Sequence, residues 1–292
     1  MITKFNQNDL KRLWKPKEDS SGEDNGQVTI IGGSSLFHGA PMLAIKAASR
    51  LVDMVFFGSP ERDLEKVAKL NSFIWVPWEE IDKYVEKSEA VLIGPGLMRF
   101  RSEGATDEEK MACDEECRKT KEITQGLLQK FPEKKWVIDG GSLQVLDPKW
   151  IPQRAILTPN KKEFELLAGT SPLPFPSPNL GEGPGERYIG EFAKKYNCVI
   201  VAKGPVAYVT DGKTTYEIDG GNAGLTKGGT GDTLAGIITG LFAKNDGLLA
   251  AAAGTYLIKK TAKELYKKVG YNFNADDVAE NVFEVSRELV TS

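Results

Sequence analysis

The stretch that decides the fold reads Asn222-Ala-Gly-Leu-Thr-Lys-Gly-Gly-Thr-Gly-Asp-Thr-Leu-Ala-Gly236. A glycine-rich turn runs here into a helix of small and apolar residues. Glycine lets the backbone pass close to an anion, because it carries no side chain. The first helical turn offers that anion unpaired N–H groups and the positive end of the helix dipole. The stretch therefore predicts an α/β protein with an anion site at the start of one helix.

Asp232 lies in the first turn of this predicted helix. A carboxylate beside a bound phosphate can take a proton from an attacking hydroxyl, as general-base catalysis requires. The alternative is that Asp232 only caps the helix. The density of glycine around it favours the catalytic interpretation. The stretch is not a Walker loop, because the Gly-Lys-Ser/Thr ending is missing.

Outward from this stretch, short apolar runs alternate with longer amphipathic ones, which is typical of βα repeats and a mostly parallel sheet. The runs predict strands at Val28–Ile31, Met54–Phe57, Phe73–Val76, Ala90–Ile93, Trp136–Ile138, Ala155–Leu157 and Val199–Ala202. A hairpin with a primed turn at Asp211-Gly212 should join Val206–Thr210 to Thr215–Ile218. The predicted helices are Ala40–Leu51, Glu61–Lys69, Glu79–Glu86, Thr106–Lys130, Asp232–Lys244, Gly247–Val269 and Asp276–Leu289.

Four further segments follow predicted strands and contain glycine or polar residues. They are Ile30-Ile-Gly-Gly-Ser-Ser-Leu-Phe-His-Gly-Ala-Pro41, Leu92-Ile-Gly-Pro-Gly-Leu97, Leu157-Thr-Pro-Asn-Lys-Lys-Glu-Phe-Glu-Leu-Leu167 and Lys203-Gly-Pro-Val-Ala207. Ligands of open α/β sheets bind at the carboxyl ends of parallel strands. We therefore expect these segments to surround the site of Asp232, although each could also be a plain connecting turn.

Composition excludes several classes of protein. The 292 residues are 40% hydrophobic and carry a formal net charge of −3, so nothing favours a nucleic acid or an anionic membrane as partner. No apolar run approaches the roughly 20 residues that span a bilayer, and the N-terminus lacks the apolar region of a signal peptide. We expect a cytoplasmic protein.

Cys113, Cys117 and Cys198 predict ordinary thiols rather than disulfides. With His38 the sole histidine, no metal site is predicted.

Residues 171–186 hold five prolines and three glycines without periodicity. Such a segment cannot form a helix or a sheet ladder, and it predicts a mobile surface insertion. A proline-rich docking peptide is the alternative. We find no linker between two cores, so the expected organisation is an N-terminal extension at 1–27 and one domain at 28–292.

Taken in order, these motifs resemble the ADP/ATP-dependent NAD(P)H-hydrate dehydratases, a branch of the ribokinase-like superfamily. Gly-Gly-Ser…Gly-Ala-Pro, Gly-Pro-Gly, Thr-Pro-Asn…Glu-Phe, Lys-Gly and Gly-Gly-Thr-Gly-Asp occur in sequence. The resemblance implies a three-layer α/β/α sandwich around a central, mostly parallel sheet. It implies an enzyme that returns hydrated NADH or NADPH, as the S epimer, to the intact cofactor. ADP or ATP would be consumed, and Mg²⁺ would bridge its phosphates.

The resemblance also assigns site residues. Asp232 would deprotonate the C6 hydroxyl of the hydrate, which then attacks the terminal phosphate. The hydrated dinucleotide would contact Asp232 together with Ala40, Gly96, Asn160, Lys161, Lys162, Glu163, Phe164, Glu165 and Leu166. The adenine nucleotide would be held by Lys203, Gly204, Pro205, Val206, Ala207, Gly228, Gly229, Thr230 and Gly231.

Some features stay open after the resemblance. Many bacterial members carry histidine where this chain has Asn160, and eukaryotic members often carry asparagine, so the choice between ADP and ATP is not decided. About 27 residues precede Val28, too few for the epimerase domain often fused to this family, so we expect dehydration alone. Self-association is possible on the same resemblance. The alternatives are a small-molecule kinase of the same fold and a silent module that senses nucleotides.

Overall fold

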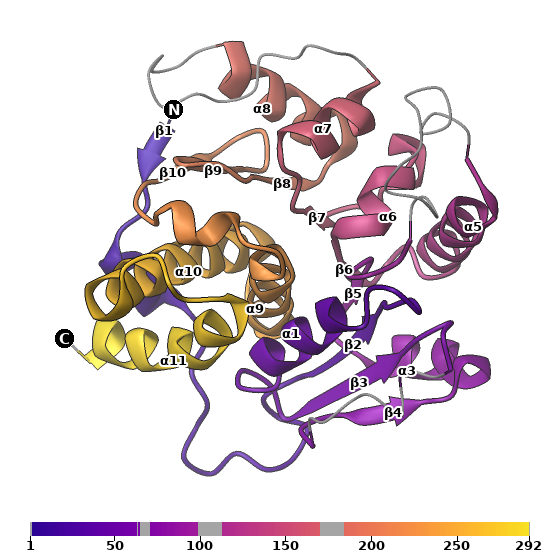
Figure 1. Ribbon diagram of the computed structural model, residues 1–292, viewed down its shortest axis with the longest axis horizontal. Coiled ribbons are helices and arrows are strands. Elements are labelled where there is room, and N and C mark those ends of the chain that lie inside the picture. The colour runs from indigo at the N-terminus through magenta and orange to yellow at the C-terminus, as the bar shows by residue number, and fades with distance from the viewer. Residues whose placement is uncertain (1, 63, 65–70, 99–112, 170–183, 292) are drawn as a thin grey trace.

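One ten-stranded sheet organises the computed structural model, which describes residues 2–62, 64, 71–98, 113–169 and 184–291 (Figure 1). The strand order is β1-β10-β9-β8-β7-β6-β5-β2-β3-β4. β9 is antiparallel to both of its neighbours, and the other pairs are parallel. The strands are β1 Ile2–Lys4, β2 Gln27–Ile31, β3 Met54–Gly58, β4 Ile74–Val76, β5 Ala90–Ile93, β6 Lys135–Ile138, β7 Ile156–Leu157, β8 Val199–Ala202, β9 Ala207–Thr210 and β10 Thr215–Ile218.

Helices cover both faces of the sheet. On one face lie α1 Gly39–Ala48, α9 Thr230–Lys244, α10 Gly247–Val269 and α11 Ala275–Thr291. On the other lie α3 Ile81–Lys87, α5 Glu115–Lys130, α6 Gly140–Val145, α7 Lys161–Ala168 and α8 Pro184–Tyr196. Short 3₁₀ helices are η1 Gln7–Arg12, η2 Trp78–Glu80, η3 Pro148–Trp150 and η4 Ala223–Thr226. The predicted three-layer α/β/α architecture is confirmed.

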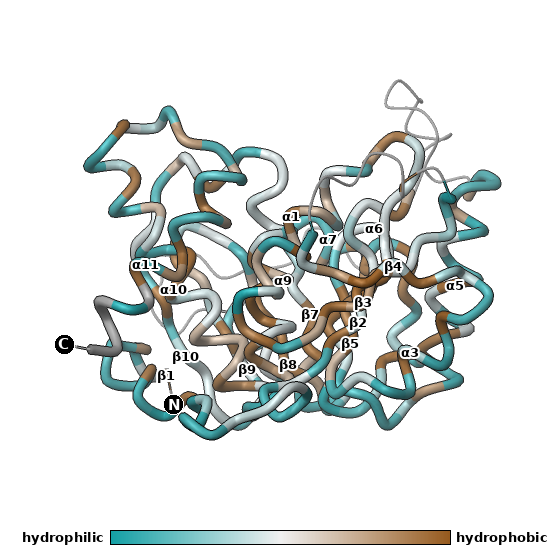
Figure 2. Tube along the Cα trace, turned by 90° about the horizontal axis from the view of Figure 1, so that it is seen from below, coloured by the Kyte–Doolittle hydropathy of each residue, from teal (hydrophilic) through white to brown (hydrophobic). Residues whose placement is uncertain are grey.

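Two separate cores follow from the alternation of side chains along each strand. In β2, Val28 and Ile30 join the core under α9 and α10, whereas Ile31 joins the core under α5 and α7. Figure 2 shows these hydrophobic strands between more hydrophilic outer segments. Strands buried on both faces need apolar residues at nearly every position. This is why continuous apolar runs predicted them.

α1 and α9 pack closely because Gly236 has no side chain. A Cβ built on Gly236 would lie 2.3 Å from the carbonyl oxygen of Ala44 and 2.7 Å from its Cα. The neighbouring atoms are backbone, so they cannot move aside as a flexible side chain would. This contact fixes the helix that carries Asp232 against the helix that follows β2.

We expect Gly236→Ala to destabilise the protein by roughly 1–3 kcal/mol, as overpacking does, and to lower the melting temperature. Gly126→Ala is the matched control, because Gly126 lies inside α5 with nothing within 4 Å of the added Cβ. Alanine there should be neutral or mildly stabilising. Thermal unfolding followed by circular dichroism compares the two variants. Equal melting temperatures would show that α1 and α9 are not in close contact.

Several predicted elements differ from the structure. α6 and α8 were not predicted, because α6 spans fewer than two turns and α8 begins inside the proline-rich segment. Pro184, Gly185 and Glu186, placed in the surface insertion, form the first turn of α8, where proline lacks only an unused N–H. That part of the prediction is wrong. The rest of the insertion, most of the predicted helix Glu61–Lys69 and the start of Thr106–Lys130 lie outside the described residues.

The N-terminal segment takes part in the sheet. β1 pairs in parallel with β10 at one edge, and Phe5 and Leu10 are buried in the core under α10 and α11. The segment that we expected to precede the domain therefore contributes a strand and core side chains to it.

Cys113 and Cys117 form a disulfide at the start of α5. The prediction of two free thiols is wrong here. Cys113 precedes the cap residue Asp114 and Cys117 lies in the first turn of α5, and their Cα atoms are 5.2 Å apart, within the usual range for a disulfide. Cys198 is a buried free thiol, and burial raises its pKa to about 12.

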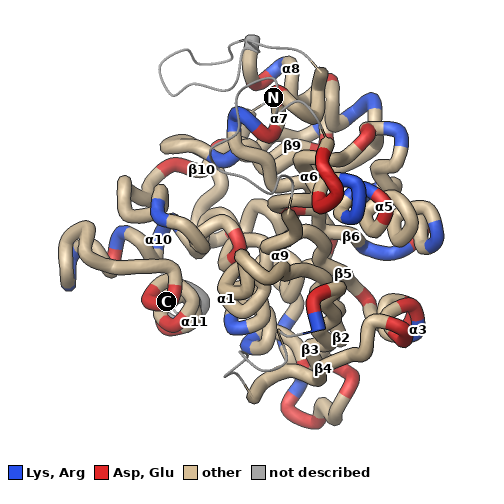
Figure 3. The backbone as a smooth tube through the Cα atoms, turned by 45° about the vertical axis from the view of Figure 1, so that its right-hand side comes forward, with Lys and Arg blue, Asp and Glu red and all other residues tan. Residues whose placement is uncertain are grey.

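Charged residues of both signs are interspersed on the outer helices and loops (Figure 3). Within the described part of the chain, every helix is too short or too polar to cross a membrane.

Candidate active site

Glycines bring the loops at the carboxyl ends of β2, β5 and β6 into contact. The N–H of Gly33 donates to the carbonyl of Pro95 at 2.8 Å. Gly94 has φ +118°, and a Cβ there would lie 1.8 Å from the carbonyl oxygen of Asp139. Gly96 has φ +73°, and its Cβ would lie 2.3 Å from the carbonyl oxygen of Phe37. Only glycine fits these approaches and these dihedral angles. Two of the four predicted segments, those after β2 and β5, are therefore in contact with each other and with the end of β6.

Asp232 lies in the first turn of α9, as predicted. Gly229 starts the helix with φ +91°. The Thr230 hydroxyl oxygen lies 2.7 and 2.9 Å from the carbonyl oxygens of Leu225 and Lys227, which share its single proton and attach the glycine-rich loop to the helix start. Gly229, the residue before the helix, has no side chain that could cap it. The N–H of Thr230 donates to the carbonyl of Lys227 at 3.4 Å, so an anion would meet the N–H groups that follow, from Gly231 on.

Lys203 connects the helix start to two buried carboxylates. Its Nζ lies 3.1 Å from Oδ1 of Asp139 and 3.7 Å from Oε2 of Glu163. A Cβ built on Gly231 would lie 3.5 Å from the same Nζ. The ammonium group of Lys203 therefore lies beside the anion site and is paired with the carboxylates of Asp139 and Glu163. Asp139 is 3% exposed, and it also accepts a 2.6 Å hydrogen bond from the hydroxyl of Thr158.

The charges around Asp232 set its proton affinity. Burial, followed by the negative charge of Asp139, raises the pKa of Asp232 to about 7. The positive charge of Lys203 opposes this rise. Burial lowers the pKa of Lys203, but Asp139 and Glu163 outweigh it, so that pKa lies above its ordinary value. A carboxyl group with a pKa near neutrality is suited to accept a proton at physiological pH.

Most of the residues expected to contact the dinucleotide are at least partly exposed, whereas Glu163 and Phe164 are buried. Ala40, in the first turn of α1, and Gly96, in the loop after β5, are partly exposed. Asn160 caps α7 and forms a capping box with Glu163, so Glu163 both orders this helix and holds Lys203. Phe164 is fully buried against Tyr188 and Phe192 and offers no surface to a ligand. On the outer side of α7, Lys161, Lys162 and Leu166 are exposed and Glu165 is partly exposed.

The residues expected to hold the nucleotide lie on two loops that meet at Lys203 and Gly231. Gly204, Pro205 and Gly228 are exposed, and Val206 and Gly229 are partly exposed. Ala207 is 2% exposed inside β9, and Thr230 is buried with its hydroxyl already bonded. These two residues therefore support the loops from inside.

We did not single out Asp139 from the sequence. The signal was present, because Ile138-Asp-Gly-Gly141 follows a predicted strand with a polar residue and two glycines. The same criterion had selected the segments after β2, β5 and β7. Asp139 belongs to the site because it contacts Lys203. These residues are 64 positions apart, so no local sequence pattern indicates the contact.

The described residues include no group of three or more His, Cys, Asp or Glu side chains placed to hold a metal ion. Asp139 and Glu163 already face Lys203. Mg²⁺ usually takes several of its ligands from substrate phosphates and water, and a bound nucleotide would supply such phosphates here.

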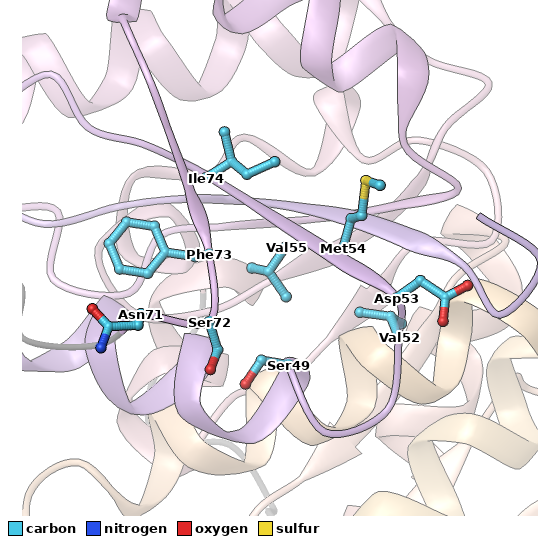
Figure 4. Close-up of a pocket in the computed structure, with 9 residues that line it drawn as sticks. All are labelled: Ser49, Val52, Asp53, Met54, Val55, Asn71, Ser72, Phe73 and Ile74. Carbon is cyan, nitrogen blue, oxygen red and sulfur yellow. The ribbon is translucent and has the colours of Figure 1, made fainter. Parts of the chain in front are cut away.

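A separate hollow lies away from this site. It has a volume of about 260 Å³ and lies at the amino ends of β3 and β4 (Figure 4). Of the nine described residues that line it, only Asp53 is charged, and the Asp53 carboxylate already accepts two hydrogen bonds from Asn25. We assign no function to this hollow.

Comparison with known proteins decides the family. The family model of the NAD(P)H-hydrate dehydratases matches residues 28–283, from β2 into α11. The chain therefore belongs to the NAD(P)H-hydrate dehydratase family. The match includes Asp232, Lys203 and Asp139, so the whole charge network belongs to the dehydratase domain.

Individual relatives agree with this assignment. A bifunctional NAD(P)H-hydrate repair enzyme of Methanocaldococcus jannaschii is 31% identical over 94% of this chain and 50% of its own length. An ADP-dependent (S)-NAD(P)H-hydrate dehydratase of Nitrosopumilus maritimus is 27% identical over 93% of this chain and 92% of its own. The chain spans about half the length of the bifunctional relatives.

Solved ribokinase-like structures share the fold. One is the ADP/ATP-dependent NAD(P)H-hydrate dehydratase of Bacillus subtilis, co-crystallised with ATP and Mg²⁺. Its TM-score is 0.76 at 22% identity, with 98% of both chains covered. The dehydratase fold expected from the sequence is thus confirmed.

Proposed function

We propose that this chain dehydrates the S epimer of hydrated NADH and NADPH and consumes ADP or ATP in doing so. The observation that carries the proposal is the position of Asp232. Its pKa is raised to about 7, and it lies in the first turn of a helix that begins without a side-chain cap and beside Lys203. Membership of the family, together with the names of the relatives, supports the same activity.

In the first step, Asp232 accepts the proton of the hydroxyl group on C6 of the hydrated nicotinamide ring. The hydroxyl oxygen attacks the terminal phosphorus of the nucleotide, and AMP or ADP leaves. The backbone N–H groups of Gly231 and its neighbours, with Lys203, stabilise the charge on the transferring phosphoryl group. Any bound Mg²⁺ would neutralise part of the phosphate charge.

In the second step, the new phosphate ester leaves as inorganic phosphate. The lone pair of the ring nitrogen expels it, and loss of a proton from the adjacent ring carbon restores the dihydropyridine. Phosphorylation is needed because hydroxide is a poor leaving group at neutral pH. The protein supplies the position of the reactants and the base, which are the main contributions to phosphoryl transfer.

The direct test incubates the chain with hydrated NADH, Mg²⁺ and either ADP or ATP, and follows the absorbance band of reduced nicotinamide. We expect NADH to appear only with nucleotide, in equal amount to the phosphate released. A stable phosphorylated product without NADH would favour the small-molecule kinase instead. Binding of both ligands without any turnover would favour the sensing module.

The rate should depend on pH through Asp232. The base must be ionised to accept a proton, so protonation below its pKa of about 7 removes activity. We expect kcat/KM to fall about tenfold per pH unit on the acid side and to level off above neutrality. A rate that stays constant between pH 5 and 8 would contradict a base with this pKa.

We further propose a cytoplasmic location, where both nucleotides occur, and self-association, which the family resemblance suggests. Size-exclusion chromatography with light scattering tests the second proposal.

A further inference from the structure

A buried lysine that the proposed mechanism does not use lies beneath the nucleotide loops. Lys259, on α10, is 5% exposed. Its Nζ donates to the backbone carbonyls of Gly204 at 3.0 Å, Pro205 at 2.7 Å and Gly220 at 3.1 Å. An ammonium group has three protons, so each one is used by a different carbonyl group.

Two of the three carbonyls come from a segment expected to hold the nucleotide, and the third, Gly220, lies ahead of the other such segment. Gly204 and Pro205 follow Lys203 in the loop between β8 and β9. Gly220 follows β10 and leads into the glycine-rich loop before α9. Gly220 and Gly221 have φ +93° and +74°, a left-handed turn that glycine adopts without strain. One ammonium group therefore joins two segments that are otherwise separated by the β9–β10 hairpin.

A second contact ties the glycine-rich side to the same helix. The side-chain amide of Asn222 donates to the carbonyl of Ala262 at 2.7 Å, while its oxygen accepts from the N–H of Gly224 at 2.9 Å. Among the described residues of α10, Lys259 is the one whose side chain hydrogen-bonds to the loop between β8 and β9. Removing the ammonium group should therefore loosen that loop most.

Packing alone does not require a charge at this position. Burial lowers the pKa of Lys259 to about 8, with the charge of Asp219 opposing this. A buried ammonium group costs free energy unless its protons are hydrogen-bonded, and an apolar side chain would fill the space without that cost. The three carbonyl contacts are what the charge provides.

We propose that Lys259 is a positioning residue for the nucleotide. It joins the Gly204–Pro205 loop to the Gly220 turn, which leads into the glycine-rich loop, and so sets the spacing between the two loops expected to bind ADP or ATP. Lys259 does not contact the reacting atoms. This inference rests on the proposed function and adds to it a residue remote from the chemistry.

The test measures nucleotide binding by calorimetry and the kinetics of both substrates in Lys259→Met, which keeps the length of the stem and loses the donors. We expect the Kd and KM of ADP or ATP to rise on the order of 10- to 100-fold, as small displacements in a binding site do. The KM of hydrated NADH and kcat at saturating nucleotide should change less than about threefold. Lys263→Met is the matched control, because Lys263 is exposed on the same helix.

Lys259→Gln keeps one amide group that can donate, and it should lie between wild type and Lys259→Met. It also carries the test should the methionine variant fail to fold. Unchanged nucleotide affinity, or equal weakening of both substrates, would overturn the inference. If the unaltered chain bound neither ADP nor ATP, the proposed function would be wrong and this inference with it.

Discussion

Asp232→Asn should lower kcat by on the order of 10²- to 10⁴-fold, the usual effect of losing a positioned general base. The amide has the same shape as the carboxyl group but cannot accept the hydroxyl proton. The anion site beside it is formed mainly by backbone N–H groups and Lys203, which the substitution leaves in place. We therefore expect the Kd of ADP or ATP to change less than about threefold. Single-turnover measurement of NADH formation, with calorimetry of the nucleotide, checks both parts.

The same substitution should stabilise the folded protein. The pKa of Asp232 is about 7 in the folded state and lies near its ordinary value, about 3.9, when unfolded. The folded state therefore binds the proton more tightly, and stability is lost as pH rises between these two values. At pH 8 the asparagine variant should be more stable by about 2 to 4 kcal/mol, and near pH 3.5 the difference should vanish.

Urea unfolding at the two pH values measures this difference. A variant that loses activity and is also less stable at pH 8 would indicate that Asp232 is structural, contrary to both expectations. Asp276→Asn is the matched control. Asp276 lies in the first turn of α11 with a largely exposed side chain that pairs with Lys46, so its neutralisation should leave kcat unchanged.

The sheet and the main helices were predictable because their signals are local. Val28–Ile31 and Val199–Ala202 are apolar at each position or nearly so, as strands buried on both faces must be. Gly247–Val269 was predicted with the bounds that the structure gives, since a long helix that starts after an aspartate cap and ends at glycine has two clear boundaries. α6 carries no such signal. Its six residues follow a strand directly and are too few to show a helical period.

The candidate site was only partly predictable. Asp232 and the glycines stand in one continuous stretch, so their relation is visible in the sequence. The partners of Lys203 and Lys259 are not, because they depend on which strand ends and loops become neighbours. Lys203 was expected to hold the nucleotide, and the structure adds that Asp139 and Glu163 hold Lys203. Phe164 shows the converse. It shares a motif with Asn160, but the helical turn points it into the core.

The second large effect should come from Lys203→Met. This substitution leaves Asp139 and Glu163, which are 3% and 7% exposed, without their shared cation. Removing one partner of a buried ion pair typically costs about 3–5 kcal/mol. We therefore expect a marked fall in the midpoint of urea unfolding at pH 8. The substitution also removes the positive charge of Lys203, which lowers the pKa of Asp232. That pKa should therefore rise further, and the acid limb of the pH–rate profile should move to higher pH.

A double variant separates the loss of the ion pair from a loss of packing. In Lys203→Met with Asp139→Asn, one of the two unpaired carboxylates is gone, while the amide oxygen can still accept from Thr158. This double variant should be more stable than Lys203→Met alone, although Asp139→Asn in the wild-type background should be destabilising because it removes the ammonium group's nearest partner. Stability changes that simply add would contradict the coupling. If the double variant is more stable than the sum of the two single changes predicts, Asp139 and Lys203 are energetically coupled. Asp139 would then help to hold Lys203 beside the start of α9, where the transferring phosphoryl group is expected to lie.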